Sequence, residues 1–391
     1  MKILVVCQYY YPEPFRIHEV CEELVARGHE VTVLTGLPNY PMGIIPDEYK
    51  GGQRRREDIN GVKVIRVNEI PRTDGKIGLA KNYVSFVCSG SLKALTMKKD
   101  FDVIFVYQLS PILMAIPAFV AKWFSKTKKL ALYCLDLWPE SLASLNIQKD
   151  SAFFKMIKHV SKKIYNGADV VGYTSTQFET YFREELRLKQ KNYRYIPQFA
   201  DALFDEVSEN NSEGINFVFA GNVGKMQSVD TIIRAAALVD DANIRWHIVG
   251  DGFALDSCKE LARKLGVEDR VIFYGRMPVE EMPKYYAMAD AMLVTLADNK
   301  AISYTLPGKV QSYMAAGKPI LASAGGETKR LIEEARCGMC AAPEDADELA
   351  KLAKEIAKAD TKAMGCRSRE YYREHFSKKK HVDRIEEMLN G

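Results

Sequence analysis

Short runs of consecutive apolar residues alternate with amphipathic segments along this chain of 391 residues. Residues 2–7 form the first apolar run and residues 29–35 the second, with an amphipathic segment at 17–27 between them. Apolar runs of about four to eight residues are typical of parallel strands that are covered on both faces, and the segment between them has the period of a helix. The pattern therefore predicts a β–α–β unit that opens an α/β domain.

The same alternation continues to the end of the chain. Further strands are predicted at residues 62–67, 101–107, 130–135, 168–174, 215–220, 244–249, 271–274, 290–296 and 320–323. Further helices are predicted at residues 77–97, 112–124, 151–165, 229–238, 307–316 and 378–389. Residues 38–61 are rich in proline, glycine and charge, so they are expected to form a long loop.

A polar segment at residues 202–214 divides the pattern into two halves, and such a segment is typical of a linker. The strand at 168–174 is expected to be the last of the first half. The chain is long enough for two domains of ordinary size. We expect one α/β domain over residues 1–200 and a second over residues 201–377.

Charge is distributed unevenly between the two halves. Residues 1–200 contain 29 lysines and arginines against 20 aspartates and glutamates, whereas residues 201–391 contain 26 against 31. The basic first half suggests an anionic partner or surface. The predicted helices at 77–97 and 112–124 have apolar faces near lysines, which suits docking at an anionic membrane. The segment at 112–124 is too short to span a bilayer, which needs about twenty residues, so a core helix is the favoured interpretation and membrane docking the alternative. Each run of lysines taken singly is better explained as a solvated helix face.

The eight cysteines show no spacing typical of a disulfide framework, and Cys337–Cys340 is a single CxxC motif without a second pair. Reduced thiols and the lack of a predicted signal peptide indicate a cytoplasmic protein.

No G-x-G-x-x-G motif follows the first strand, which disfavours an NAD-dependent dehydrogenase. Asp345 and Asp347 follow a proline at a predicted helix start, so they indicate capping and not a metal site.

The helix start at residues 307–309 and the turn at 221–227 are candidates for binding phosphate. Pro307 and Gly308 open a short helix with Lys309 in its first turn, and a helix N-terminus favours anions through its free N–H groups and its dipole. An ordinary helix–turn–strand remains an equal alternative. The turn at 221–227 and the strand exit at 275–278 lie on the same predicted rim.

Asp136 and Glu140 directly follow the predicted strand at 130–135. Ligands of open α/β sheets bind at the carboxyl ends of strands, so both carboxylates lie where chemistry is expected. A role for Asp136 in capping the next turn is equally consistent with the sequence.

Several motifs occur in an order that resembles glycosyltransferase family 4 over nearly the whole chain. They are a Tyr-Pro-rich loop after the first strand, R-G-H-E-V-T-V-L-T at 27–35, A-G-N at 220–222, V-G-D-G at 249–252 and M-A-A-G-K-P at 314–319. The segments G-L-P-N-Y-P at 36–41, D-L-W-P-E-S at 136–141 and P-x-K at 307–309 resemble one subgroup. That subgroup is assigned to fucosamine and other deoxyamino-sugar transferases of O-antigen, capsule and exopolysaccharide biosynthesis.

The resemblance implies a GT-B fold, in which two doubly wound Rossmann-like domains face each other across a cleft. The N-terminal domain would bind the acceptor, the C-terminal domain would bind a nucleotide-sugar donor, and the last helix, at 378–391, would pack back on the N-terminal domain. The resemblance also implies retention at the anomeric carbon without a metal. No cofactor is expected, because the nucleotide sugar is a substrate.

The chain departs from the family at several site positions. Asn222 and Gln227 occupy the places of an arginine and a lysine that often hold the diphosphate. The two family glutamates correspond to Tyr304 and Ser312. The resemblance and the turns together predict Asp136 and Lys309 as catalytic residues. The predicted donor-binding residues are Arg16, Gly221, Asn222, Gly224, Lys225, Arg276, Met277, Pro307, Lys309 and Ser312.

The sequence therefore predicts a glycosyltransferase that uses a nucleotide sugar, with UDP as the expected nucleotide. Its expected acceptor is a lipid-linked or oligosaccharide molecule of bacterial surface polysaccharide assembly, and no nucleic acid partner is expected. It is expected to be cytoplasmic, with peripheral contact to the inner face of an anionic membrane. The alternatives are a sugar-nucleotide epimerase of the same fold and a non-catalytic basic protein that binds membranes or nucleic acids.

Overall fold

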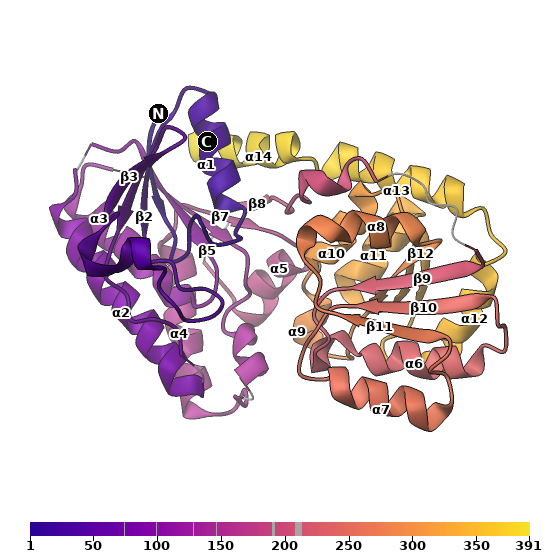
Figure 1. The fold of residues 1–391 in the computed structure, drawn as a ribbon. Coiled ribbons are helices and arrows are strands. Elements are labelled where there is room, and N and C mark those ends of the chain that lie inside the picture. The colour runs from indigo at the N-terminus through magenta and orange to yellow at the C-terminus, as the bar shows by residue number, and fades with distance from the viewer. Residues whose placement is uncertain (74, 99, 128, 146, 190–191, 208–212) are drawn as a thin grey trace. The chain divides into compact units, whose positions relative to one another are not determined.

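The structure is a computed structural model that describes residues 1–73, 75–98, 100–127, 129–145, 147–189, 192–207 and 213–391. The chain divides into two compact units (Figure 1). The N-terminal unit comprises residues 1–174, 178–196 and 382–391, and the C-terminal unit comprises residues 175–177 and 197–381. Each unit has its own parallel sheet and is described separately below.

The sheet of the N-terminal unit has, within the described residues, the strand order β3-β4-β2-β1-β5-β6-β7-β8. Its strands are β1 (Lys2–Val6), β2 (Glu30–Thr35), β3 (Arg56–Ile59), β4 (Val62–Arg66), β5 (Val103–Gln108), β6 (Lys129–Cys134), β7 (Val170–Tyr173) and β8 (Tyr193–Tyr195). Its helices are α1 (Ile17–Ala26), α2 (Gly75–Thr96), α3 (Ile116–Phe124), α4 (Ala152–Gly167), most of α5 (Thr176–Thr180) and most of α14 (Lys378–Asn390). All strand pairs are parallel except β3 with β4.

The sheet of the C-terminal unit is entirely parallel in the described residues, with the order β11-β10-β9-β12-β13-β14. Its strands are β9 (Ile215–Ala220), β10 (Ile244–Val249), β11 (Val271–Gly275), β12 (Ala291–Thr295), β13 (Ile320–Ser323) and β14 (Gly338–Ala341). Its helices are α6 (Val229–Leu238), α7 (Leu255–Leu265), α8 (Met282–Met288), α9 (Lys300–Ser303), α10 (Gly308–Ala315), α11 (Gly326–Ala335), α12 (Ala346–Ile356) and α13 (Thr361–His375). The predicted strands and helices of this half are present, and Asp345 caps α12 by accepting a hydrogen bond from the backbone N–H of Glu348 at 2.9 Å.

Two predictions for the N-terminal half are wrong. The expected loop at 38–61 contains a short 3₁₀ helix at Asp47–Gly52 and the edge strand β3. β3 pairs with β4 through a turn at Asn60 and Gly61, whose φ angles are 50° and 83°. Asn-Gly is a strong signal for this kind of hairpin, but the charged residues before it did not indicate a strand. The strand at 170–173 is also not the last of its sheet, because the short strand β8 follows it.

Two further predictions are modified by the structure. The predicted helix at 112–124 is a 3₁₀ turn at Ile112–Ala115 followed by α3, since Pro117 lies in the first turn of α3. The predicted linker begins with a 3₁₀ turn at Ala202–Phe204, and its residues 208–212 lie outside the described part of the chain.

The last helix, α14, completes the N-terminal unit. Val382, Ile385 and Met388 are fully buried. The sulfur of Met388 occupies the space that a side chain at position 172 on β7 would need, and this position is a glycine. Arg27, at the end of α1, forms ion pairs with Asp383 at 2.8 Å and with Glu386 at 3.0 Å. The end of the chain is therefore part of the first unit's core.

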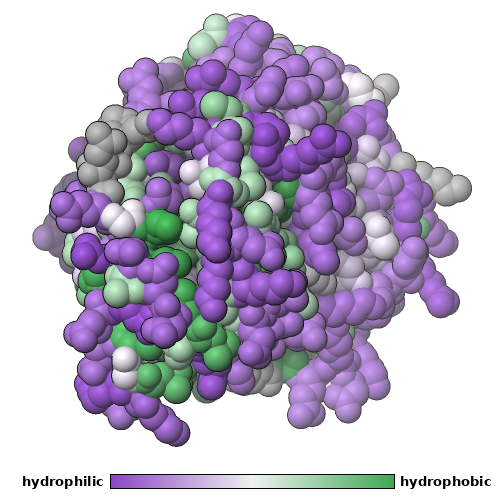
Figure 2. Space-filling model, turned by 90° about the vertical axis from the view of Figure 1, so that its right-hand side faces the viewer, coloured by the Kyte–Doolittle hydropathy of each residue, from purple (hydrophilic) through white to green (hydrophobic). Residues whose placement is uncertain are grey.

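On the face drawn in Figure 2, the surface is mainly hydrophilic, and hydrophobic residues show only in small groups between polar side chains. Within the described residues, no helix combines the length and the apolar character that crossing a membrane requires.

Candidate functional site

Glycine residues lie at the positions where β9, β10 and β11 end. The backbone N–H of Gly221 donates to the carbonyl of Val249 at 2.9 Å, and that of Gly250 donates to the carbonyl of Gly275 at 2.8 Å. A Cβ atom at position 250 would lie only 1.8 Å from the carbonyl oxygen of Gly221. Glycine at this position therefore lets the turns after two neighbouring strands touch, which also suits its φ of 143°.

These turns surround a cavity of about 450 Å³ at the carboxyl ends of the strands. It is lined by Gly221, Asn222, Val249, Gly250, Asp251, Gly252, Arg276, Met277 and Met282. Four of the predicted donor-binding residues thus come together, and they do so where open α/β sheets bind ligands. The lining residues at 249–252 and Met282 were not among the predicted site residues.

Lys309 lies beside this glycine-rich rim. It is in the first turn of α10, and a Cβ atom added to Gly221 would lie 2.8 Å from its Nζ atom. Part of the side chain is exposed, but Nζ itself is buried and has no hydrogen-bond acceptor among the described residues. Nζ lies 3.7 Å from the centroid of the Phe219 ring, where a cation–π interaction stabilises the charge in part.

Burial without an acceptor disfavours the charged form of Lys309. Desolvation lowers the pKa of Lys309 from 10.5 to about 7. A buried ammonium group without an acceptor is costly, and an anionic ligand that supplied oxygen atoms would remove that cost. An anion that bound beside Nζ would therefore stabilise the charged form of Lys309.

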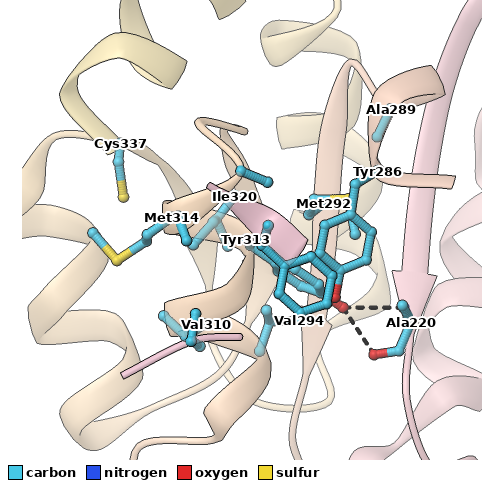
Figure 3. Packing of buried hydrophobic residues seen from close by; sticks show 14 of the residues in the cluster. Ala220, Tyr286, Ala289, Met292, Val294, Val310, Tyr313, Met314, Ile320 and Cys337 are labelled. Atoms are coloured by element: carbon cyan, nitrogen blue, oxygen red, sulfur yellow. Dashed lines mark hydrogen bonds between the residues drawn. The ribbon is translucent and has the colours of Figure 1, made fainter. Parts of the chain in front are cut away.

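The position of α10 is set by Tyr313, which follows Lys309 by one helical turn. The Tyr313 hydroxyl accepts a hydrogen bond from the backbone N–H of Ala220 and donates one to the carbonyl of Ala220, both at 3.0 Å (Figure 3). Ala220 is the last residue of β9 and immediately precedes Gly221. One buried side chain thus joins the helix that carries Lys309 to the strand that ends at the cavity.

The other predicted donor-binding residues are distributed around the start of α10 and the turn after β9. Pro307 is the N-cap residue of α10, and the Ser312 hydroxyl donates to the Gly308 carbonyl at 3.3 Å. Asn222 and Gln227 form a side-chain hydrogen bond at 3.1 Å.

Like Pro307, Lys309 and Ser312, three further predicted residues do not line the cavity. Gly224 precedes the 3₁₀ turn at Lys225–Gln227, and Lys225 is exposed. Arg16 belongs to the N-terminal unit, at the start of α1, and forms an ion pair with Glu19 at 2.7 Å.

The position that corresponds to the first family glutamate, Tyr304, is buried, and its carbonyl accepts a hydrogen bond from the Ser175 hydroxyl. The fully buried carboxylate nearby, Glu327 in the first turn of α11, is already paired with Arg330 at 2.7 Å and with the Thr176 hydroxyl at 2.5 Å. No unpaired carboxylate therefore takes over these positions within the described residues.

Asp136 lies in a separate pocket of about 270 Å³ in the N-terminal unit. The pocket is lined by Tyr9, Phe15, Tyr40, Arg72, Leu79, Tyr83, Leu109, Ser110, Asp136, Trp138 and Ser141. Burial raises the pKa of Asp136, and hydrogen bonds from Ser110 oppose that increase in part. The carboxylate thus faces the loop after β5, and burial brings its pKa closer to the range in which it can accept a proton.

Glu140, the other carboxylate predicted at this rim, has a structural role. It is buried, accepts a hydrogen bond from the Tyr181 hydroxyl at 2.9 Å and pairs with Lys149 at 2.5 Å. It does not line the pocket that holds Asp136.

Sequence reasoning missed several side chains of both sites. Phe219 and Tyr313 belong to apolar segments and look like ordinary core residues in the sequence. Tyr9 and Tyr40 occur in segments noted only as family motifs, and no sequence signal distinguishes Arg72. These residues acquire their roles only through contacts between distant segments.

Comparison with known proteins agrees with this geometry. Residues 15–198 match the family model described as "Glycosyl transferase 4-like domain", and residues 202–374 match the model described as "Glycosyl transferases group 1". The chain is 28% identical over 317 residues to "Probable glycosyltransferase WbjE" of Pseudomonas aeruginosa, covering 77% of this chain and 76% of that protein. It is 23% identical over 371 residues to "Putative colanic acid biosynthesis glycosyl transferase WcaI" of Escherichia coli K12, covering 89% of this chain and 90% of that protein.

Solved structures share the fold at low sequence identity. Sucrose-phosphate synthase from Thermosynechococcus elongatus superimposes with a TM-score of 0.77 at 19% identity, covering 99% of this chain and 98% of that one. Anabaena HepE in complex with UDP superimposes with a TM-score of 0.71 at 17% identity, covering 100% and 99%. The chain therefore has the GT-B fold, with two Rossmann-like α/β domains. It is a glycosyltransferase of the GT-B type, and its relatives include proteins of bacterial polysaccharide biosynthesis.

The link between Tyr313 and Ala220 can be tested by Tyr313→Phe. The variant removes one donor and one acceptor, so the free energy of unfolding of the C-terminal unit should fall by about 1–3 kcal/mol in urea. Tyr286→Phe is a matched control, because Tyr286 is also buried and its ring centroid lies 5.3 Å from that of Tyr313. Equal unfolding free energies for the two variants would show that the hydroxyl of Tyr313 does not hold α10 in place.

Proposed function

We propose that this glycosyltransferase moves a sugar from a UDP-linked donor to a lipid-linked or oligosaccharide acceptor in the assembly of a bacterial surface polysaccharide. The observation that carries the proposal is the buried Nζ atom of Lys309, which lacks an acceptor and lies beside the glycine-rich rim. The UDP complex of HepE supports the donor, and the name of WcaI, a relative assigned to colanic acid biosynthesis, supports the pathway. The motifs of the deoxyamino-sugar subgroup favour an N-acetylated or deoxyamino hexose as the sugar that is transferred.

The proposed reaction proceeds with retention and without a metal, as the family resemblance implies. The bond between the anomeric carbon and the diphosphate breaks, and the acceptor hydroxyl forms the new bond on the same face of the sugar. The leaving diphosphate gains negative charge, which Lys309 and the N-terminus of α10 would stabilise. The backbone N–H group of Gly224 would assist, and Lys225 and Arg16 are weaker candidates for the same charge.

Other residues of the cavity would bind the rest of the donor. Arg276 and Met277 follow β11 at the rim, where the nucleotide base would lie. Ser312 lies one turn after the start of α10, where the ribose would lie. Asn222 and Pro307 would shape the passage for the diphosphate between them.

The proposal predicts that UDP binding is linked to a proton. Lys309 has a pKa of about 7 in the free protein, so above that pH it is mostly neutral and must take up a proton to bind diphosphate. UDP affinity should therefore fall as the pH rises from about 7 to about 9, with proton uptake seen by calorimetry in buffers of different ionisation enthalpy. Lys309→Met should weaken UDP binding by about 10- to 100-fold and abolish the uptake.

Lys351→Met is the control for this experiment, because Lys351 is exposed on α12 and lies outside the cavity. It should bind UDP as the unmodified protein does. Proton uptake that persists in Lys309→Met would show that another group interacts with the diphosphate.

Asp136 is proposed to orient or deprotonate the acceptor hydroxyl. Asp136→Asn keeps the shape of the side chain but removes its capacity to accept a proton, so transfer should slow by about 100-fold or more while UDP affinity stays unchanged. Sugar transfer and UDP binding are measured side by side, with Asp150→Asn as an exposed control. Undiminished transfer by Asp136→Asn would remove this residue from the mechanism.

Contact with an anionic membrane is proposed for α2, α3 and α4 of the N-terminal unit. Trp123 at the end of α3 is 85% exposed, and other large apolar side chains are exposed on the same helices. They are Ile77, Val84, Leu92, Leu95, Phe124, Phe153 and Met156. Exposed lysines on the helices, such as Lys76, Lys81 and Lys155, would attract anionic headgroups.

Sedimentation with vesicles that contain anionic lipid tests this surface. Trp123→Ser should reduce vesicle binding by about tenfold, because a large aromatic side chain no longer enters the interface. Phe253→Ser is the matched control, since Phe253 is fully exposed in the C-terminal unit. A protein that stays in the supernatant at low salt, or equal losses in both variants, would contradict the proposal.

A further inference from the structure

The pocket that holds Asp136 has an aromatic wall made by two separate segments. The rings of Tyr9 and Phe15 stack with centroids 5.3 Å apart and planes 15° apart. The ring of Tyr40 packs on both, with centroids 5.5 Å from Tyr9 and 5.1 Å from Phe15. Such a wall suits the apolar face of a sugar ring, because flat, rigid side chains contribute contact area at little entropic cost.

Arg72 is the one lysine or arginine among the described residues that line this pocket. Its guanidinium carbon lies 5.6 Å from the centroid of the Tyr40 ring, and no carboxylate of the described residues forms an ion pair with it. The pKa values of Tyr9 and Tyr83 are raised by burial, and the nearby Arg72 opposes that increase in both. The guanidinium therefore lies against the tyrosine side chains of the pocket, with its charge unpaired.

A buried polar network fixes the backbone of Tyr40 and of Arg72. The carboxylate of Glu13, which is only 4% exposed, accepts hydrogen bonds from the backbone N–H groups of Asn39 at 2.9 Å and Tyr40 at 2.7 Å. The side-chain carbonyl of Asn39 accepts from the backbone N–H of Arg72 at 2.9 Å. The chain thus uses buried polar groups to hold Tyr40 and Arg72 at one pocket.

A neutral sugar would leave the guanidinium charge of Arg72 without an anionic partner. Hydroxyl groups can be bound by Asp136, Ser110 and the tyrosines, whereas a guanidinium group pairs best with a carboxylate or a phosphate. Phosphate offers two oxygens to the planar fork of arginine, so it gains both charge and geometry there.

We propose that the acceptor carries a phosphate group next to its sugar, and that Arg72 binds this phosphate while the wall of Tyr9, Phe15 and Tyr40 packs on the sugar. This inference rests on the proposed glycosyltransferase function and names the chemical class of its acceptor. Two sources share this chemistry: a soluble sugar phosphate and a sugar linked to a lipid through phosphate.

Binding experiments with three probes test the inference, with UDP at saturation so that the donor site is occupied. Glucose 1-phosphate should bind at least about tenfold more tightly than methyl glucoside, by titration followed in NMR spectra. Arg72→Gln should remove this preference, and Arg72→Lys should keep part of it, because lysine retains the charge without the fork. Arg194→Gln, at an exposed arginine of the same unit, should keep the full preference.

Farnesyl diphosphate, the third probe, distinguishes the two sources. Tighter binding of farnesyl diphosphate than of glucose 1-phosphate assigns a lipid-linked acceptor, and the reverse assigns a soluble sugar phosphate. Equal binding of the charged and uncharged sugars, or a preference that survives in Arg72→Gln, overturns the inference.

UDP binding is measured separately for each variant. Unchanged UDP affinity in Arg72→Gln shows that the C-terminal unit is folded, and an unchanged urea unfolding curve shows the same for the N-terminal unit, which carries Arg72. Failure of UDP to bind the unmodified protein overturns the donor proposal and leaves the phosphate preference to be judged on its own.

Discussion

An amine buried without a hydrogen-bond acceptor among the described residues is the constraint on which the proposed donor site depends. Lys309 Nζ is buried beside Gly221 and lies over the Phe219 ring. Tyr313 connects α10, which carries this lysine, to the end of β9. If an anion binds beside Nζ, as proposed, it stabilises the charged form of the amine, which favours a diphosphate over neutral ligands.

The two proposed sites differ in the residues that line them. Three of the nine described residues that line the C-terminal cavity are glycines, whose turns bring main-chain atoms close to one another. The N-terminal pocket is lined by larger side chains, among them Tyr40, whose backbone N–H donates to the buried carboxylate of Glu13. A pocket lined by such side chains can change its specificity by substitution more readily than a site in which glycine turns leave little room for side chains.

The sequence predicted most of the fold and part of the sites. Apolar runs locate the central strands, and a proline followed by a lysine locates the start of α10, because both signals are local. The strand β3 was missed since its charged residues face solvent at a sheet edge, although Asn60 and Gly61 carried the turn signal. Arg72 could not be found, because its pocket is assembled from segments around residues 9, 40 and 136 that meet only in the folded chain.

The return of α14 to the first unit affects how the protein is made. Val382, Ile385 and Met388 fill the core under β7, yet they are translated only after the C-terminal unit. Domains generally fold in the order of their synthesis. We therefore expect the N-terminal unit to complete its core only after the whole C-terminal unit has been translated. Until then, the apolar surface that α14 covers stays exposed on one face of the sheet.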